Sequence, residues 1–222
     1  MSNKTVILDP GHGMDATGLF ARPLMNCNGL KAVAVPDSMY EHKNEFSPGF
    51  YREDTGTLYI AKQAARYLEA QGHTVFLTRQ GRENAKEYLS SLSDNKWKRQ
   101  YWKSWKWVKE FTIEKKADIF VSIHTNAGRG KGSACFWAST PNGVDLSWDL
   151  VSELRDQLNI KTRNVSKHRF LILRDICDGR AAFLECLFHD NINEIKLMLS
   201  RKGIDSIAKA VADGIHKHTL KF

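Results

Sequence analysis

An alternation of short strand-like and longer helix-like patterns runs through the 222-residue chain and limits its fold more than any other feature. Short runs rich in β-branched and aromatic residues are typical of buried strands, whereas apolar residues three and four positions apart indicate helices. The strand-like runs are Val6–Leu8, Thr74–Thr78, Ile119–Ile123, Ser133–Trp137, Phe170–Leu173 and Ala182–Leu187. The helix-like stretches are Thr57–Gln71, Asp94–Lys115, Leu146–Leu158 and Asn193–His218. This order predicts an α/β fold with a mostly parallel, mixed sheet of about six strands flanked by helices.

The whole chain, residues 1–222, is predicted to form a single domain, because no linker, internal repeat or low-complexity tract divides it. Gly72 follows the first helix, and a strand begins at once, as in a strand–helix–strand unit with a short return. Residues 14–51 do not fit this pattern, since they contain three prolines and show no sustained period. We therefore expect a long loop insertion there, of the kind that often lines a binding site.

A tryptophan-rich helix is predicted around residues 97–111. Its apolar stripe is typical of a surface that faces the core and consists of Trp97, Tyr101, Trp105 and Val108. Trp102 and Trp107 lie off this stripe. Two interpretations are open for them, stacking on sugars and contact with a membrane surface.

The charge balance is basic, with 33 Lys and Arg against 25 Asp and Glu, a formal net charge of +8. A positive surface attracts polyanions, but it does not select among nucleic acid, anionic membranes and anionic cell walls. We expect no transmembrane segment and no secretory signal, because no apolar stretch reaches about 20 residues and the first apolar run is short. The four cysteines show no CxxC spacing, which favours free thiols in a reducing compartment.

Polar residues that can bind a metal stand at the ends of three predicted strands. His12 follows the first strand between two glycines, His124 ends the strand that begins at Ile119, and Glu185 lies within the last strand. Ligands of open α/β sheets gather at the carboxyl ends of strands, so these three side chains are predicted to converge. A carboxylate inside an apolar strand is costly unless it has a partner or a task.

Two histidines and one carboxylate form a ligand set that suits Zn²⁺ and leaves a fourth position for water. A second carboxylate, not bound to the metal, can move the proton of that water. The residues alone do not identify the remaining metal ligand, since the irregular segment before the first helix offers Glu41, His42 and Glu45 as well as Glu53.

Five ordered motifs resemble those of the zinc N-acetylmuramoyl-L-alanine amidases of the amidase 3 type. They are Val6-Ile-Leu-Asp-Pro-Gly-His-Gly13, Arg52-Glu-Asp with Leu58-Tyr-Ile-Ala61, Val75-Phe-Leu-Thr-Arg79, Ala117-Asp-Ile-Phe-Val-Ser-Ile-His-Thr-Asn-Ala127, and Leu184-Glu185 through Asn191. A terminal helix around residues 207–215 is also similar to the last helix of this family. The resemblance covers residues 5 to about 215, nearly the whole chain.

The resemblance implies a role for each matching position. It makes His12, Glu53 and His124 the zinc ligands and Glu185 the catalytic base. Arg174 is a candidate to bind a stem-peptide carboxylate or to steady the oxyanion, with an exposed structural arginine as the alternative. Asp9 is a candidate to hold the outer nitrogen of a ligand histidine, with a turn residue as the alternative.

The chain also departs from the family pattern. Where the family has Leu-Gly-Phe after the glutamate, this sequence has Cys186-Leu187-Phe188, so we expect a differently shaped pocket floor. The long insertion of residues 14–51 separates the first ligand from the second, which puts the substrate preference in doubt.

The resulting functional hypothesis is hydrolysis of the amide bond between N-acetylmuramic acid and L-alanine in bacterial peptidoglycan, with Zn²⁺ as cofactor. The alternatives are a zinc peptidase acting on stem peptides, a basic protein that binds polyanions or cell walls without catalysis, and a thiol hydrolase that uses Cys135 or Cys186. We further expect a monomer that has no separate wall-binding domain and binds no specific nucleic acid. Its basic surface is expected to bind anionic envelope polymers. The expected setting is a bacteriophage endolysin, made in a bacterial cytoplasm and acting on the wall after release, with an enzyme freed when a mother cell lyses as the alternative.

Overall fold

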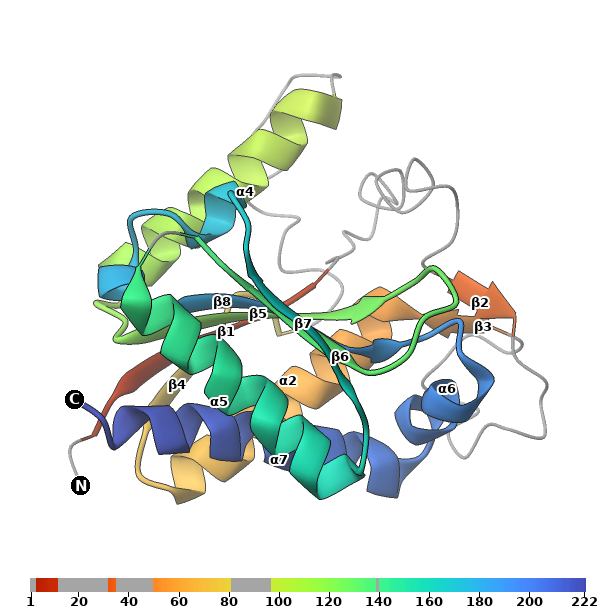
Figure 1. Cartoon of the computed structure of the whole chain (residues 1–222). Helices are drawn as coiled ribbons and strands as arrows, with labels where there is room; N and C mark the ends of the chain where they lie inside the picture. Colours follow the sequence, from red (N-terminus) through yellow and green to blue (C-terminus); the bar gives the residue numbers. More distant parts are fainter. Residues whose placement is uncertain (1–2, 12–31, 35–49, 81–96, 139) are drawn as a thin grey trace.

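The computed structural model describes residues 3–11, 32–34, 50–80, 97–138 and 140–222, with the backbone alone at 32–34, 50, 52 and 97–104. Its main sheet has six strands in the order β4-β1-β5-β8-β6-β7 (Figure 1). The strands are β1 (Thr5–Pro10), β4 (Thr74–Leu77), β5 (Ile119–Asn126), β6 (Ser133–Trp137), β7 (Thr162–Lys167) and β8 (Ala181–Phe188). The predicted α/β class with a six-stranded sheet is confirmed.

Four neighbouring strands of this sheet run in the same direction. β1 pairs in parallel with β4 and with β5, and β5 pairs in parallel with β8. β6 is antiparallel to β8 and parallel to β7, which makes the sheet mixed, as predicted. The carboxyl ends of β1, β4, β5 and β8 therefore meet at one edge of the sheet.

One face of the sheet is covered by α2 (Glu53–Ala70), α5 (Pro141–Leu158) and α7 (Arg201–Thr219), with α6 (Ile192–Leu199) beside them (Figure 1). The other face carries α4 (Trp97–Glu114) and the short 3₁₀ turns η2 (Leu171–Leu173) and η3 (Cys177–Gly179). Successive strand side chains point to opposite faces. Accordingly Val6 and Leu8 lie in the core under α2, α5 and α7, whereas Ile7 lies in the second core under α4.

Local sequence signals set several helix ends. Thr140 caps α5, accepting a hydrogen bond from the Gly143 backbone N–H, and a proline follows at the first helical position. Ser200 caps α7 by accepting from the Gly203 N–H at 3.0 Å. Ser200 also ends α6, so the single final helix predicted for Asn193–His218 was wrong, and the segment is two helices.

One predicted strand is absent from the structure, and one strand of the main sheet was not predicted. Phe170–Leu173 was predicted as a strand, but Leu171–Leu173 forms the 3₁₀ turn η2, with Ile172 and Leu173 buried in the second core. Its apolar residues therefore pack against the sheet without belonging to it. β7 was not predicted, because its sequence is mostly polar; as an edge strand it buries little of its surface.

The predicted insertion at residues 14–51 is described only in part. Within it, β2 (Ala32–Ala34) pairs in antiparallel register with β3 (Phe50–Arg52), so this segment contains a small sheet of its own. The remainder of the insertion lies outside the described residues. No helix in the described part of the chain is both long enough and apolar enough to span a membrane.

Candidate active site

His124 and Glu185 are neighbours at the carboxyl edge of the sheet. They are register partners on the parallel strands β5 and β8, so their side chains leave the sheet on the same face. His124 is buried, and Glu185 is partly exposed. The structure thus brings together two of the residues that the sequence placed at strand ends.

Glu53 lies against His124. As the first residue of α2, it places its carboxylate where the helix dipole favours negative charge. Its Oε1 lies 3.1 Å from His124 Nδ1 and accepts a hydrogen bond from the Thr125 backbone N–H at 2.9 Å. Its exposed fraction is 0%. The carboxylate and the imidazole are therefore held as a buried pair.

The imidazole of His124 is enclosed on both of its faces. One face meets Gly11, where an added Cβ atom would come within 2.4 Å of His124 Cε1. The other face stacks on the Phe183 ring, with ring centroids 4.1 Å apart. Only a glycine allows the end of β1 to approach the ring so closely, and the sandwich leaves the ring little freedom to tilt.

The separation of Glu53 and His124 fits two donors on one metal ion. Zinc bonds of about 2.0–2.1 Å at a tetrahedral angle place two ligand atoms about 3.3 Å apart, close to the observed 3.1 Å between Oε1 and Nδ1. Of the predicted ligands, His12 follows directly after the last described residue of its segment and lies outside the described residues. In the part of the chain that the structure describes, no three His, Cys, Asp or Glu side chains form a metal-binding group.

The competing ligands Glu41, His42 and Glu45 also lie outside the described residues. The contact with His124 favours Glu53, although its role as a ligand stays a prediction.

Asp9 does not contact His124. Its two carboxylate oxygens accept hydrogen bonds from the hydroxyls of Thr78 and Ser122, each at 2.6 Å. Asp9 thereby links β1 to β5 and to the end of β4. These bonds involve no histidine, and His124 Nδ1 faces Glu53. Because His12 lies outside the described residues, the hypothesis that Asp9 holds the outer nitrogen of a ligand histidine stays a prediction.

The segment after β8 supports the site through contacts that the sequence analysis missed. His189 is fully buried, and its Nδ1 lies 3.0 Å from Thr125 Oγ1. The Asp190 carboxylate accepts from the backbone N–H groups of Gly128 and Arg129, and the Glu194 carboxylate accepts from those of Gly132 and Phe188. These acids therefore fix the loop after His124 by backbone contacts. Motif matching indicated only the spacing of this segment, not the contacts.

Two residues that depart from the family pattern follow Glu185 in β8. Cys186 and Leu187 are fully buried in the core under α2, α5 and α7. Strand alternation puts Cys186 on the face opposite Glu185. Cys186 therefore fills the core behind the sheet and does not line the site. Leu187 stands where the family has its glycine, and the expectation of a differently shaped pocket floor stays a prediction.

The buried thiols argue against a cysteine nucleophile. Burial raises the pKa of Cys135 to about 12 and raises that of Cys186 well above its ordinary value. A thiol must ionise to attack a carbonyl, and both cysteines are shut off from solvent. Cys27 lies outside the described residues.

The structure leaves the predicted role of Arg174 open, but it accounts for Trp107 by packing. Arg174 follows η2, and its Nη2 donates to the Arg169 carbonyl at 2.7 Å. Its proposed contact with substrate stays a prediction. Trp107 is partly buried, packs against the second core and stacks on Phe111 at 5.3 Å, so a structural role accounts for it. The side chain of Trp102 lies outside the described residues.

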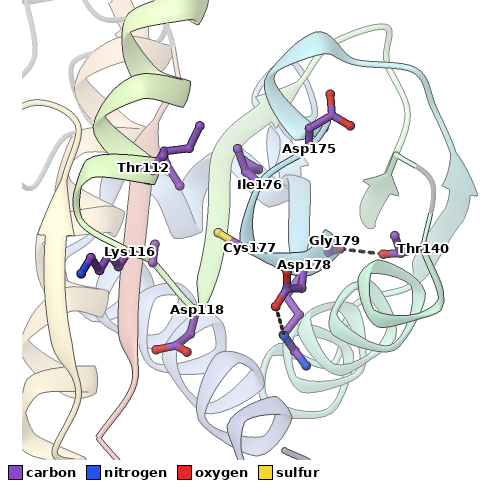
Figure 2. Close-up of a pocket in the computed structure, with 12 residues that line it drawn as sticks. Thr112, Lys116, Asp118, Thr140, Asp175, Ile176, Cys177, Asp178 and Gly179 are labelled. Atoms are coloured by element: carbon purple, nitrogen blue, oxygen red, sulfur yellow. Dashed lines mark hydrogen bonds and ion pairs between the residues drawn. The ribbon is translucent and has the colours of Figure 1, made fainter.

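A cleft with a volume of about 790 Å³ opens at the opposite edge of the sheet, between the end of α4 and η3 (Figure 2). Its lining includes Asp118, Cys177 and Arg180, and Arg180 lies 3.8 Å from Asp178. Burial raises the pKa of the Cys177 thiol to about 12. None of the predicted site residues that the structure describes lines this cleft.

The same site lies on a fold shared with known amidases. The chain is similar to the CwlD amidase of Clostridioides difficile, solved in complex with the GerS lipoprotein, with 25% identity, a TM-score of 0.75 and coverage of 99% of this chain and 100% of that one. It is also similar in fold to the amidase AmiC2 of Nostoc punctiforme, with 20% identity, a TM-score of 0.66 and coverage of 99% and 98%.

A curated relative and a family model give the same assignment. The protein named probable cell wall amidase LytH, from Staphylococcus saprophyticus, is 21% identical over 98% of this chain. The chain spans 59% of the length of that relative. The family model for N-acetylmuramoyl-L-alanine amidase matches residues 6–217. The chain therefore belongs to the N-acetylmuramoyl-L-alanine amidase family.

Proposed function

We propose that this protein is a zinc-dependent amidase that cleaves peptidoglycan between N-acetylmuramic acid and the L-alanine of the stem peptide. The observation that carries the proposal is the buried pair of Glu53 and His124, with Glu185 next to it. Glu185 is the register partner of His124 on the neighbouring strand. Family membership supports the reaction class, and the donor geometry supports the metal.

In this proposal three residues are metal ligands and a fourth transfers protons. His12, Glu53 and His124 would hold Zn²⁺, which when bound would supply Lewis acidity to activate water and to polarise the carbonyl oxygen of the scissile bond. Glu185, partly exposed beside His124, accepts the proton of the attacking water and returns it to the alanine nitrogen, which would otherwise leave as an anion.

The surrounding chain holds these groups in place. The Thr125 N–H fixes the Glu53 carboxylate, and Gly11 and Phe183 enclose the His124 ring. A site held in advance loses little entropy when it binds the metal and substrate.

The decisive test is mass spectrometry of purified peptidoglycan after digestion with the purified protein. We expect stem peptides with a free L-alanine amino terminus, together with glycan strands that have lost their peptides. Fragments cut within the stem peptide would identify a peptidase instead. A digest without products, from protein that still binds walls, would leave the non-catalytic binding module as the function.

We also propose that anionic envelope polymers meet a defined part of the basic surface. Exposed cations follow the loop between β5 and β6, the edge strand β7 and the residues just after it. We call this set the cationic strip: Arg129, Lys131, Lys161, Arg163, Lys167 and Arg169. None of its members forms an ion pair with a carboxylate of the described residues, and residues 157–174 include no Asp or Glu. Such a strip favours phosphate-rich or carboxylate-rich polymers.

The proposed setting is lysis of a phage-infected host. It predicts that the protein, made inside a bacterium, lyses the cell only after the membrane has been permeabilised. Lysis without permeabilisation would contradict this setting, and it would leave the reaction itself untouched.

A further inference from the structure

Arg79 is a buried cation that bridges two of the segments forming the site. It follows β4, and only 6% of its surface is exposed. Its Nε donates to the Pro10 carbonyl at 3.1 Å, and its Nη2 donates to the carbonyls of Gly11 at 3.1 Å and Asp54 at 2.6 Å. One guanidinium thus joins the end of β1 to the first turn of α2.

The bridged carbonyls flank two predicted zinc ligands. Gly11 immediately precedes His12, and Asp54 immediately follows Glu53. Gly11 also presses against the His124 ring, so its position bears on the third predicted ligand. A shift in either carbonyl would therefore change the spacing of the ligand set.

Thr57 completes the same bridge. Its Oγ1 lies 2.9 Å from the carbonyl oxygens of both Gly11 and Glu53, and 3.4 Å from Arg79 Nη2. The hydroxyl and the guanidinium therefore act on the same two segments. A planar guanidinium can serve several acceptors in fixed directions, which the single ammonium of lysine cannot do.

We propose that Arg79 is a positioning residue for the metal site, holding the end of β1 and the start of α2 at the separation that zinc binding requires. This inference rests on the proposed function, because it takes His12 and Glu53 to be ligands. It adds a residue that touches neither metal nor substrate and acts through the backbone on both sides of the site.

The test compares Arg79→Lys and Arg79→Gln with wild type by titrating Zn²⁺ against a chromogenic chelator, with folding checked by circular dichroism. We expect each variant to bind Zn²⁺ at least tenfold more weakly, the usual effect of losing a group that orients ligands. We expect kcat to fall with KM little changed, since no substrate contact is removed. Lysine should not rescue zinc affinity, because it keeps the charge but not the planar fork.

Two further variants keep the test decisive. Arg66→Gln, on the exposed side of α2, removes an arginine whose side chain donates to the nearby Gln63, and it should leave zinc affinity unchanged. Thr57→Val keeps Arg79 while removing the hydroxyl that joins the two carbonyls, and it should weaken zinc binding by a smaller factor. If the Arg79 variants do not fold, Thr57→Val decides the outcome.

The results separate three cases. A folded Arg79→Lys protein with zinc affinity within twofold of wild type would overturn the inference, even if its melting temperature fell, because the arginine would then be merely structural. If only Thr57→Val folds, zinc affinity within twofold of wild type would overturn it as well, because the bridge between the two segments would then not set the spacing of the ligands. Weaker zinc binding by these variants, with Arg66→Gln unchanged, would support it. Wild-type protein that binds no zinc would refute the proposed function itself.

Discussion

Replacing Gly11 with alanine is expected to displace the His124 ring. An added Cβ would lie 2.4 Å from His124 Cε1 and 2.5 Å from Nδ1, whereas ordinary contact begins at 3.4 Å. The ring or the end of β1 must therefore move by about 1 Å, the difference between 3.4 and 2.4 Å. The ring cannot retreat freely, because Phe183 stacks on its other face at 4.1 Å.

A displacement of this size has two consequences. Misplacing a reacting group by about 1 Å costs roughly 10²-fold in rate, so we expect turnover on purified peptidoglycan to fall by that factor and zinc affinity to fall with it. Overpacking of a well-filled site costs about 1–3 kcal/mol of stability. Urea unfolding measures the stability, and competition with a chelator measures the zinc affinity. The release of stem peptides measures the turnover.

Gly72→Ala is the matched control. Gly72 has φ +89° but no atom within 4 Å of an added Cβ, so alanine there strains the backbone by roughly 1–2 kcal/mol without a clash. We expect it to lower stability and to leave zinc affinity and turnover unchanged. If Gly11→Ala kept both within twofold of wild type, the argument that the enclosed ring sets the site geometry would be refuted.

Glu185→Gln should keep zinc and stability while turnover falls by about 10²–10⁴; loss of zinc instead would show that Glu185 is a ligand. Glu53→Ala removes the carboxylate that His124 Nδ1 and the Thr125 N–H face, so the zinc content should fall. Full zinc content with full activity would instead assign the ligand role to Glu41, His42 or Glu45. Neutralising the cationic strip with glutamine should flatten the salt dependence of binding to insoluble walls, because about 0.15 M salt screens exposed charges beyond about 8 Å; an unchanged slope would place binding elsewhere. Burial, together with the charges of His216 and Lys4, lowers the pKa of His73 in the folded protein. As the pH drops below about 6.5, His73 therefore binds a proton more readily in the unfolded chain than in the folded one, and the stability of the fold decreases. His73→Gln should reduce the drop in the urea midpoint between pH 7 and pH 5.5, and an equal drop would contradict this linkage.

Local patterns along the chain were sufficient for the fold class and for most of its strands. β1, β5, β6 and β8 were predicted because a strand buried on both faces must be apolar along its length, and this leaves a readable signal. The same reasoning failed for Leu171–Leu173, since burial alone does not distinguish a strand from a 3₁₀ turn packed on a sheet. It also missed β7, because an edge strand needs little apolar surface.

The site, too, has features that the sequence predicts and features that depend on tertiary contacts. The positions of His124 and Glu185 within buried strands were evident from the sequence, because a polar residue interrupting an apolar run is conspicuous. Their register on neighbouring strands and the approach of Glu53 depend on contacts between residues far apart in the chain. Arg79 carries no periodic or metal-ligand signal, and its role follows only from the carbonyls that it reaches. The sequence alone determined which chemical groups are present and which segments carry them. Only the tertiary structure decided which of those groups meet, because pairing across a sheet is set by the packing of the whole chain.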